Sequence, residues 1–398
     1  MTDITPDLIQ NEVSAPAAPV GYTREVAGRV LRRWAARLGL AWIFVLVLLA
    51  VFAPILATSY PALMKADGRW SSPMIANLSS ADVILQVAFW SALVLIPWRK
   101  SALVKSAIWG AVLIVTAIPS LLFIHAPELV VYQTYRLGLQ SGQIEKAFFA
   151  PIPFSPQDHL RDIENSRLQP PDSTHWLGTT ADGADLASNM IHASRIALSI
   201  GFISTGIAVI IGVFVGALMG YYVGWIDLLG MRLVEIFDSI PTLLLLLCFV
   251  AFFKPNLYIM MAIIGATSWV SYAYFVRAEF LSLRDRDFVH AARAAGIPLH
   301  SILFRHMLLN GLTPVIVSAS FGVASAILIE STLSFLGIGL PSEASWGALL
   351  EEALGVGGTF YWWIALFPGF AIFLTVFAYN LIGESLRDAL DPRLGRMM

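Results

Sequence analysis

Eight long apolar segments dominate this chain of 398 residues. They cover residues 40–59, 83–98, 107–124, 196–221, 230–252, 257–276, 312–335 and 361–383. Hydrocarbon offers no partner to backbone N–H and C=O groups, so apolar runs of this length must satisfy those groups internally, as α-helices. Segment 83–98 is the shortest and is expected to tilt or to re-enter. The sequence therefore predicts an all-α, polytopic transmembrane helical bundle of about eight spans.

The composition supports a membrane protein. Hydrophobic residues make up 57% of the chain and charged residues only 13%, and the mean hydropathy is +0.73. Such values exceed those of mixed soluble domains, so the lipid bilayer is the first expected partner. The formal net charge of −2 gives no indication of nucleic acid binding.

The positions of the cationic residues predict the orientation. Five arginines precede the first span: Arg24, Arg29, Arg32, Arg33 and Arg37. Because cytoplasmic loops are enriched in Lys and Arg, the N-terminal lead 1–39, the segments 98–105, 221–232 and 277–311, and the tail 385–398 are expected in the cytoplasm. The long polar lead argues against a cleaved signal. We expect a multi-pass protein of the bacterial inner membrane with both termini inside.

The predicted orientation of the helices divides the chain into regions. Residues 40–124 form three N-terminal helices, residues 125–195 form an extracytoplasmic segment, and residues 196–384 form a core of five helices. The segment "APIPFSPQDHLRDIENSRLQPPDSTHW" is rich in proline, which disfavours regular helix. We therefore expect an irregular outer cap.

A polar stretch, "FVHAARAAGIPLHSILFRHMLLN" (288–310), interrupts the apolar core. Phe288, Ala291, Ala292 and Ala295 share one helix face at helical spacing. Gly296 can end that helix with a positive φ, Pro298 starts another, and Gly311 with Pro314 is expected to close it before the next span. Two short helices meeting at a corner suit a rigid knob for another protein, although a solvated connector is the simpler alternative.

This stretch resembles the cytoplasmic coupling loop of binding-protein-dependent ABC transporter permeases. The resemblance runs through Ala291, Ala292, Gly296, Phe304, Arg305, His306, Leu308 and Asn310, whereas His290 stands in place of the loop's Glu and Leu309 in place of its Pro. The resemblance implies that these side chains couple to an ATPase: Phe288, His290, Ala291, Ala292, Arg293, Ala295, Gly296, Arg305, His306 and Asn310.

A second stretch, "HWLGTTADGADLASNMIHASRIALSIGF" (175–202), is similar to the segment before the transport core in the dipeptide, oligopeptide and nickel branch, in its second permease subunit type. Its matching positions include Gly178, Thr179, Gly183, Asp185 and Arg195. Resemblance covers residues 150–393. Relatives usually carry one helix before the outer segment, whereas three are expected here, and their role stays open.

The resemblance implies a permease subunit of an ATP-driven importer for peptides or related small solutes. The sequence holds no G-x-x-x-x-G-K-[ST] motif, so ATP and Mg²⁺ are expected in one or two separate cytoplasmic ATP-binding subunits. A second permease subunit, giving a heterodimer, and an extracytoplasmic solute-binding protein complete the implied assembly. We expect Gly296→Asp to leave the chain in the membrane but to uncouple it.

The sequence leaves open the roles of several acidic residues and two alternative functions. Glu330, beside Ser331 inside a span, is a candidate pore residue or an internally bonded carboxyl, and Glu235 and Asp238 are interfacial anchors or pore-mouth residues. The histidine spacing fits no metal motif, and no catalytic motif indicates an enzyme, so no cofactor is expected in this chain. A self-contained secondary transporter and a non-transporting scaffold that binds an ATPase are the alternative functions.

Overall fold

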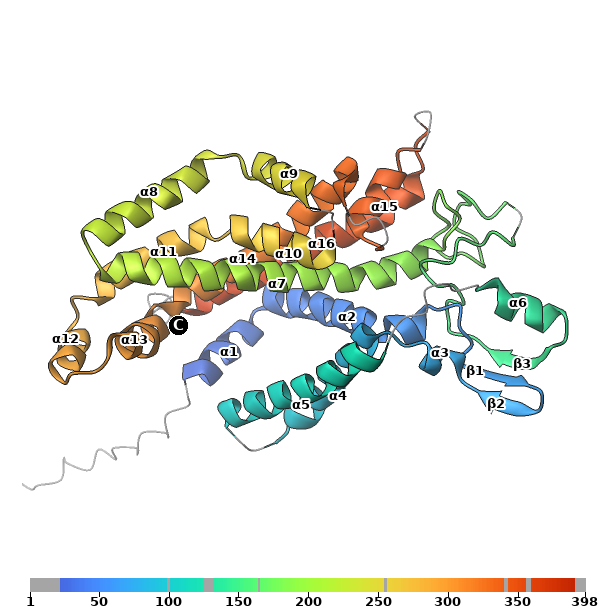
Figure 1. The fold of residues 1–398 in the computed structure, drawn as a ribbon, viewed down its shortest axis with the longest axis horizontal. Helices are drawn as coiled ribbons and strands as arrows, with labels where there is room; N and C mark the ends of the chain where they lie inside the picture. Colours follow the sequence, from blue (N-terminus) through green and yellow to red (C-terminus); the bar gives the residue numbers. More distant parts are fainter. Residues whose placement is uncertain are drawn as a thin grey trace, which may run out of the picture.

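The computed structural model describes residues 22–98, 101–124, 132–163, 165–253, 256–339, 343–355 and 359–390. It is an elongated helical bundle with two distinct ends (Figure 1). One end holds α12 (Asp287–Ala294), α13 (Leu299–Ser301), α1 (Tyr22–Arg32) and the last turns of α16 (Trp362–Leu390). The opposite end holds a small sheet and the loops before α7 (Leu186–Tyr221). This division matches the predicted separation of the polar corner from the outer segment.

The long helix α7 is the centre of the core, and α10 (Leu257–Thr267), α11 (Val270–Leu283) and α14 (Leu308–Leu333) pack along it. Three glycines of α7 face α11. A Cβ atom at Gly212 would lie 2.5 Å from the Cβ of Tyr272, and one at Gly216 would lie 2.6 Å from the carbonyl oxygen of Ala273. Gly220 is equally close to Phe280. Small residues four apart therefore let the two backbones approach closely.

All eight predicted spans correspond to helices in the described part of the chain. Five helices are long and apolar enough to cross a membrane, and two bent pairs raise this number to as many as seven. The remaining prediction is α4 (Ser80–Leu95), an apolar helix of 16 residues.

The predictions of 230–252 and 257–276 as unbroken spans were wrong. The first is α8 (Trp225–Ser239) followed by α9 (Thr242–Phe252), with a bend of 85°, and the second is α10 followed by α11, with a bend of 42°. Pro241 disfavours helical backbone at Ile240, which is extended at φ −93° and ψ 124°. At the second break, the hydroxyl of Thr267, the last residue of α10, donates to the carbonyls of Ile263 and Ile264, a contact that favours bending of a helix.

The predicted closing of the second short helix at Gly311 and Pro314 was also wrong. From Pro298 the chain passes through α13, the π-helix η1 (Ile302–Met307), α14 and a second π-helix, η2 (Ser334–Ile338), as one continuous helical segment. Gly311 lies inside α14 where α11 packs closely, with Leu283 and Glu279 at 3.3 and 3.4 Å from an added Cβ atom. Pro314 is accommodated, as prolines are in transmembrane helices.

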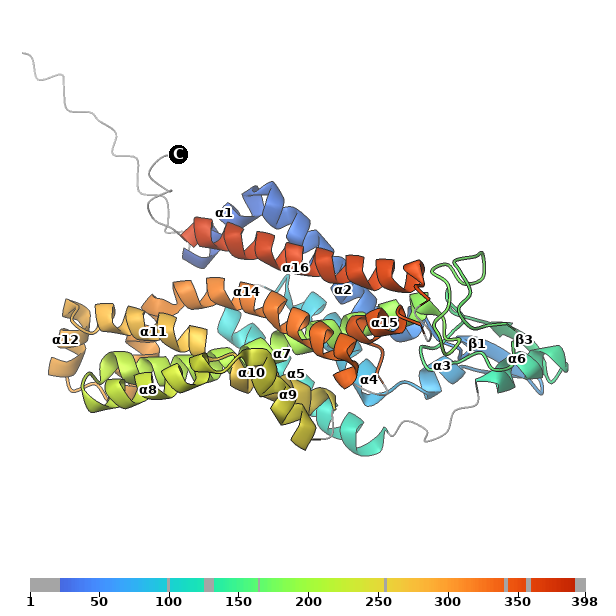
Figure 2. The same cartoon turned by 90° about the horizontal axis from the view of Figure 1, so that it is seen from above.

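The N-terminal helices brace the core. α2 (Trp34–Leu56) packs against α7 and α16, and α4 with α5 (Ala102–Phe123) forms a hairpin beside α2 (Figures 1 and 2). Gln86 of α4 donates to the Val51 carbonyl oxygen at 2.7 Å. The Arg195 guanidinium of α7 pairs with the buried carboxylate of Asp82 and donates to the Ala50 carbonyl. These contacts hold the two extra helices against the core.

The outer region is more regular than expected. It contains a three-stranded antiparallel sheet in the order β2 (Arg69–Ser71), β1 (Leu63–Ala66), β3 (Ile144–Phe148), with the short helices α3 (Pro73–Ala76) and α6 (Gln133–Gln140) beside it. Strand β3 belongs to the predicted irregular cap, and it pairs with a strand between the first two spans. The remaining outer element is α15 (Trp346–Glu352), before α16.

Candidate functional site

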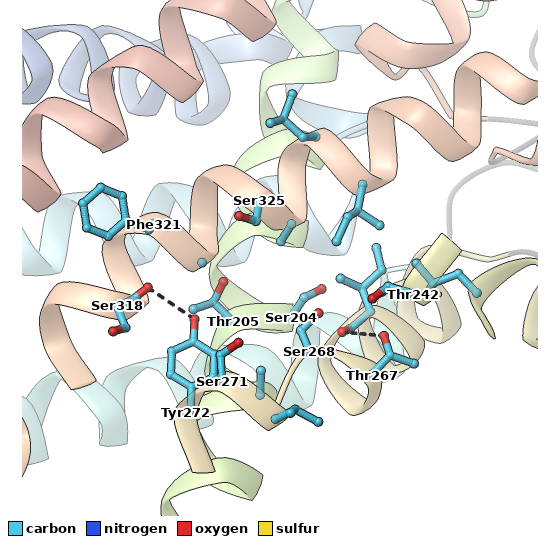
Figure 3. Close-up of a pocket in the computed structure, with 18 of the residues that line it drawn as sticks. Ser204, Thr205, Thr242, Thr267, Ser268, Ser271, Tyr272, Ser318, Phe321 and Ser325 are labelled. Carbon is cyan, nitrogen blue, oxygen red and sulfur yellow. Dashed lines mark hydrogen bonds between the residues drawn. The ribbon is translucent and has the colours of Figure 1, made fainter. Parts of the chain in front are cut away.

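A cavity of about 770 Å³ lies among α7, the break between α8 and α9, α10, α11 and α14. Hydroxyl groups line it from every side (Figure 3). They belong to Ser204, Thr205, Thr242, Thr267, Ser268, Ser271, Tyr272, Ser318, Ser325 and Thr332. Apolar side chains such as Phe237, Leu246 and Phe321 fill the space between them. These residues are not among the site residues predicted from the sequence, where their only signal is a set of isolated Ser and Thr residues within apolar spans.

Two of these hydroxyls have unused hydrogen-bonding capacity. The side-chain oxygens of Ser204 and Thr205 are buried and have no hydrogen-bond partner among the described residues. Because an unpaired buried hydroxyl is costly, these two positions are suited to water or to a polar solute in the cavity. Hydroxyls both donate and accept, so the lining can bind amide groups in either orientation.

Tyr272 and Gly322 shape the wall of the cavity. The Tyr272 hydroxyl points toward α14, where it donates to the carbonyl oxygen of Ser318 at 3.5 Å (Figure 3). It can lie there because residue 322 has no side chain: an added Cβ atom would be 1.9 Å from the hydroxyl oxygen. The glycine is therefore a steric requirement for the position of the tyrosine.

Charged groups in the lining are few. Asp238 at the end of α8 and Arg387 near the end of α16 both line the cavity, and both are exposed. Glu235 instead pairs with Arg232 on the surface of α8, at 2.5 Å. Asp238 therefore faces the cavity, whereas Glu235 forms a surface ion pair.

Glu330 does not line the cavity. Its side chain is buried near the end of α14 and accepts a hydrogen bond from the Ser334 hydroxyl at 2.7 Å, with the Ser331 hydroxyl 3.5 Å from its other oxygen. The geometry therefore fits the internally bonded carboxyl, one of the two alternatives raised from the sequence, and Ser331 belongs to the same group.

The polar corner has one face in the core and one face exposed. Val289 and Ala292 of α12 are buried in the hydrophobic cluster that also contains Phe280 and Met307. Ala291, Ala295 and Phe288 are exposed, as are His290 and Arg293. The predicted stripe therefore splits, because Ala292 packs inward while its three neighbours on the stripe are exposed.

The turn after α12 has the geometry expected at Gly296. Gly296 has φ +70°, and the Ile297 amide donates to the carbonyl of Ala292 while the Gly296 amide donates to that of Arg293. These two bonds form a Schellman motif. Ile297 packs against the same core cluster as Ala292, so the corner is fixed to the bundle rather than hinged on a loose loop.

Further contacts fix the other predicted coupling residues. The Arg293 guanidinium lies 4.8 Å from the centre of the Tyr221 ring at the end of α7. Arg305 and His306 lie in η1, where π-helical geometry often marks functional positions. Asn310 donates to the His306 carbonyl at 2.6 Å. Arg305 and Asn310 are exposed, whereas Met307 between them is buried.

The outer motif caps α7. Asp185 accepts a hydrogen bond from the Ser188 amide at 2.8 Å and lies 2.8 Å from Nδ1 of the buried His175. Thr179 pairs with Asp185 in an antiparallel bridge. Gly178 and Gly183 have φ near +85°, which glycine adopts without strain. Arg195, ten residues further along α7, instead fastens the N-terminal helices through Asp82. The motif is thus a structural cap and lies at the opposite end of the bundle from α12.

The described residues contain no group of three or more His, Cys, Asp or Glu side chains that could hold a metal ion. Neither the cavity nor the corner brings together a nucleophile and a base in the described part of the chain. The arrangement provides a hydroxyl-lined compartment in the bundle and an exposed polar corner at one end.

Residues 212–396 match the family model described as "Binding-protein-dependent transport system inner membrane component". The dipeptide transport system permease protein DppC of Alkalihalophilus pseudofirmus is 36% identical over 249 residues, 62% of this chain and 81% of that protein. The oligopeptide transport system permease protein OppC of Haemophilus influenzae is 40% identical over 55% of this chain and 70% of that protein.

One relative extends into the N-terminal helices. The inner membrane ABC transporter permease protein YejE of Escherichia coli is 32% identical over 353 residues, 88% of this chain and 92% of that protein. An alignment of that extent cannot be confined to the part of this chain after residue 124. The family resemblance noted from the sequence is confirmed, and this chain belongs to the family of binding-protein-dependent transport system inner membrane components.

Proposed function

We propose that this chain is the permease subunit of an ATP-driven importer of peptides or related small solutes, and that the hydroxyl-lined cavity is its share of the translocation pathway. The single observation that carries the proposal is the cavity itself, which lies among the helices of the family core and carries unpaired hydroxyls on α7. The named relatives DppC and OppC are dipeptide and oligopeptide permeases.

The lining supports a substrate class with common backbone chemistry. Peptides of different sequence share amide groups, and the serine and threonine hydroxyls can donate to and accept from those groups. The scarcity of charged side chains in the lining avoids strong selection by side-chain charge. Selection among solutes then falls to an extracytoplasmic solute-binding protein.

The corner supports coupling to a separate motor. The exposed face of α12 would contact one or two cytoplasmic ATPase subunits, which would hold ATP and Mg²⁺, while its buried face transmits the movement into α7, α11 and α14. Shifting a two-state pathway from 1:99 to 99:1 requires about 5.5 kcal/mol of differential binding, so a rigid joint is needed. The positive-inside distribution of Lys and Arg supports a cytoplasmic location for this end and for both termini, in a bacterial inner membrane.

A second permease subunit would complete the pathway. The helix α8 presents Leu229, Leu233 and Ile236 as exposed apolar side chains, beside the break that borders the cavity. A partner chain covering this face would enclose the open side of the cavity. A heterodimer fits the subunit type that the sequence resembles.

Uptake by the reconstituted assembly tests the proposal. The chain, its companion permease, the ATPases and the binding protein are placed in proteoliposomes, and entry of labelled dipeptides and oligopeptides is measured with and without ATP. Uptake that requires ATP supports the proposal, as does its loss in Gly296→Asp while the variant remains in the membrane. Uptake driven by an ion gradient alone would identify a secondary transporter, and ATPase binding without uptake would identify a scaffold.

A further inference from the structure

The junction between α1 and α2 lies at the level of a membrane surface. Arg33 interrupts the two helices with extended backbone, at φ −78° and ψ 128°, and α1 turns away from the line of α2 (Figures 1 and 2). The 23 residues of α2 span about 34 Å, close to the thickness of the hydrocarbon core. With α2 across the membrane, the junction therefore meets the phospholipid headgroups at the end that holds α12.

The exposed side chains at the junction are apolar and cationic together. Leu31, Trp34 and Leu38 are 54%, 69% and 57% exposed. Arg32 and Arg37 are exposed beside them, and the Arg37 guanidinium donates to the Arg32 carbonyl at 3.3 Å, which holds it at the junction. Interfacial segments combine aromatic and apolar side chains with arginine in this way.

Arg32 and Arg37 differ from the neighbouring arginines in having no acidic partner among the described residues. Arg29 pairs with Glu25, and Arg33 pairs with Asp388 of α16. Within residues 22–98, 101–124 and the other described ranges, neither Arg32 nor Arg37 has an acidic partner. Their positive charge is therefore left for a ligand.

The junction is also held in place before any ligand binds. Arg29 donates to the Ala389 carbonyl at 3.4 Å, and the Arg33 to Asp388 ion pair fastens the junction to the end of α16. A surface fixed in this way binds with little further loss of conformational entropy.

We propose that Arg32, Arg37 and Trp34 form a binding site for the phosphate headgroup of an anionic phospholipid. The guanidinium groups bind the phosphate, the indole lies at the headgroup level, and Leu31 and Leu38 contact the acyl chains. The apolar contacts favour a lipid over a free phosphate ion, which could not use them. The site is independent of the solute that crosses the membrane.

Lipid titration of the purified full chain in detergent, followed by native mass spectrometry, tests the site. Phosphatidylglycerol is expected to bind more tightly than phosphatidylcholine. Since each arginine near an anionic surface contributes on the order of fivefold in affinity, Arg32→Gln with Arg37→Gln should weaken phosphatidylglycerol binding by roughly 30-fold. Replacement of both by lysine keeps the charge and should retain most of the preference.

Arg69→Gln is the matched control, because Arg69 is an exposed arginine on β2 at the opposite end of the bundle. It should leave the preference unchanged. Equal binding of the two lipids, an unchanged preference in the double glutamine variant, or an equal loss in Arg69→Gln would overturn the proposal. Displacement of phosphatidylglycerol by millimolar inorganic phosphate would also overturn it and would indicate a site for soluble anions.

Discussion

The hydroxyl oxygen of Tyr272 occupies the space that a side chain at Gly322 would fill, with only 1.9 Å between it and an added Cβ atom. The two residues come from α11 and α14, which meet at the wall of the cavity. The identity of one residue therefore sets the position of the other.

Gly322→Ala should displace the Tyr272 ring and alter the cavity. Overpacking of this kind costs about 1–3 kcal/mol, and the shifted ring should reduce peptide uptake by the reconstituted importer. Tyr272→Phe removes the clashing oxygen, so the double variant should recover much of the stability. Gly206→Ala on α7 is the control, since nothing lies within 4 Å of its added Cβ atom. A double variant no more stable than Gly322→Ala would contradict the relationship.

The coupling turn should tolerate asparagine better than valine at residue 296. Gly296 has φ +70°, which β-branched residues avoid and asparagine adopts more readily. Nothing lies within 4 Å of an added Cβ atom there, so the difference measures backbone strain rather than crowding. Gly296→Val should reduce ATP-dependent uptake more than Gly296→Asn at equal amounts in the membrane. Equal uptake by the two variants would rule out a role for this conformation.

Close packing of α7 on α11 should make Gly216 sensitive to a single methyl group. An added Cβ atom would lie 2.6 Å from the Ala273 carbonyl and 2.8 Å from the Cβ of Val276, so the helices must separate. We expect Gly216→Ala to destabilise the chain by about 1–3 kcal/mol in a thermal unfolding assay in detergent. Gly110→Ala on α5, which has open space around it, should not lower the stability. Equal effects would show that helix separation is not the cause.

Breaking the ion pair between Asp82 and Arg195 should loosen the α4 and α5 hairpin. Asp82 is only 7% exposed, and it also completes a capping box with Ser79 at the start of α4. Arg195→Gln leaves this carboxylate buried without its cation, which costs on the order of 3–5 kcal/mol. Limited proteolysis should then cut between α4 and α5 faster than in the unaltered protein.

Arg195→Gln combined with Asp82→Asn removes the unpaired charge and should recover part of the loss. If the single variant retains the original rate of cleavage, the pair does not hold the hairpin.

Two outer carboxyls should give opposite dependences of stability on pH. Burial raises the pKa of Glu352 from 4.5 to about 7, with Asp182 and Glu351 adding to the effect. The folded state then binds more protons than the unfolded state between these values, so stability falls as pH rises from about 4.5 to about 7. Glu352→Gln should remove this loss, measured as the melting temperature across that range.

The Arg136 guanidinium instead holds the pKa of Asp162 below 3.8. The stabilisation of the folded state by the Asp162 carboxylate is present above pH 3.8 and disappears as the pH falls through the folded-state pKa. Asp162→Asn should therefore lower the melting temperature near neutral pH and matter less in acid. Identical pH profiles for Glu352→Gln and Asp162→Asn would contradict both assignments.

The sequence alone determined the membrane class, the positions of the apolar helical segments and the turn at Gly296. Each of these depends on local properties: the length of an apolar run, the distribution of Lys and Arg, and the positive φ that glycine adopts. The similarity of residues 288–310 to a coupling loop also predicted the family that the comparisons confirmed.

Only the tertiary structure decided which helices break and which continue. Pro241 lies at the break between α8 and α9, whereas Pro314 lies inside α14, against which α7, α11 and α16 pack. The local signal was the same at both positions.

The cavity and the long-range pairs also required the tertiary structure. Single serines and threonines in apolar spans indicate a site only when α7, α10, α11 and α14 bring them to one cavity. Asp82 and Arg195 are 113 residues apart, and nothing local connects them. Local sequence determines which segments enter the membrane, but a shared site depends on which helix faces meet, and helix packing alone determines that.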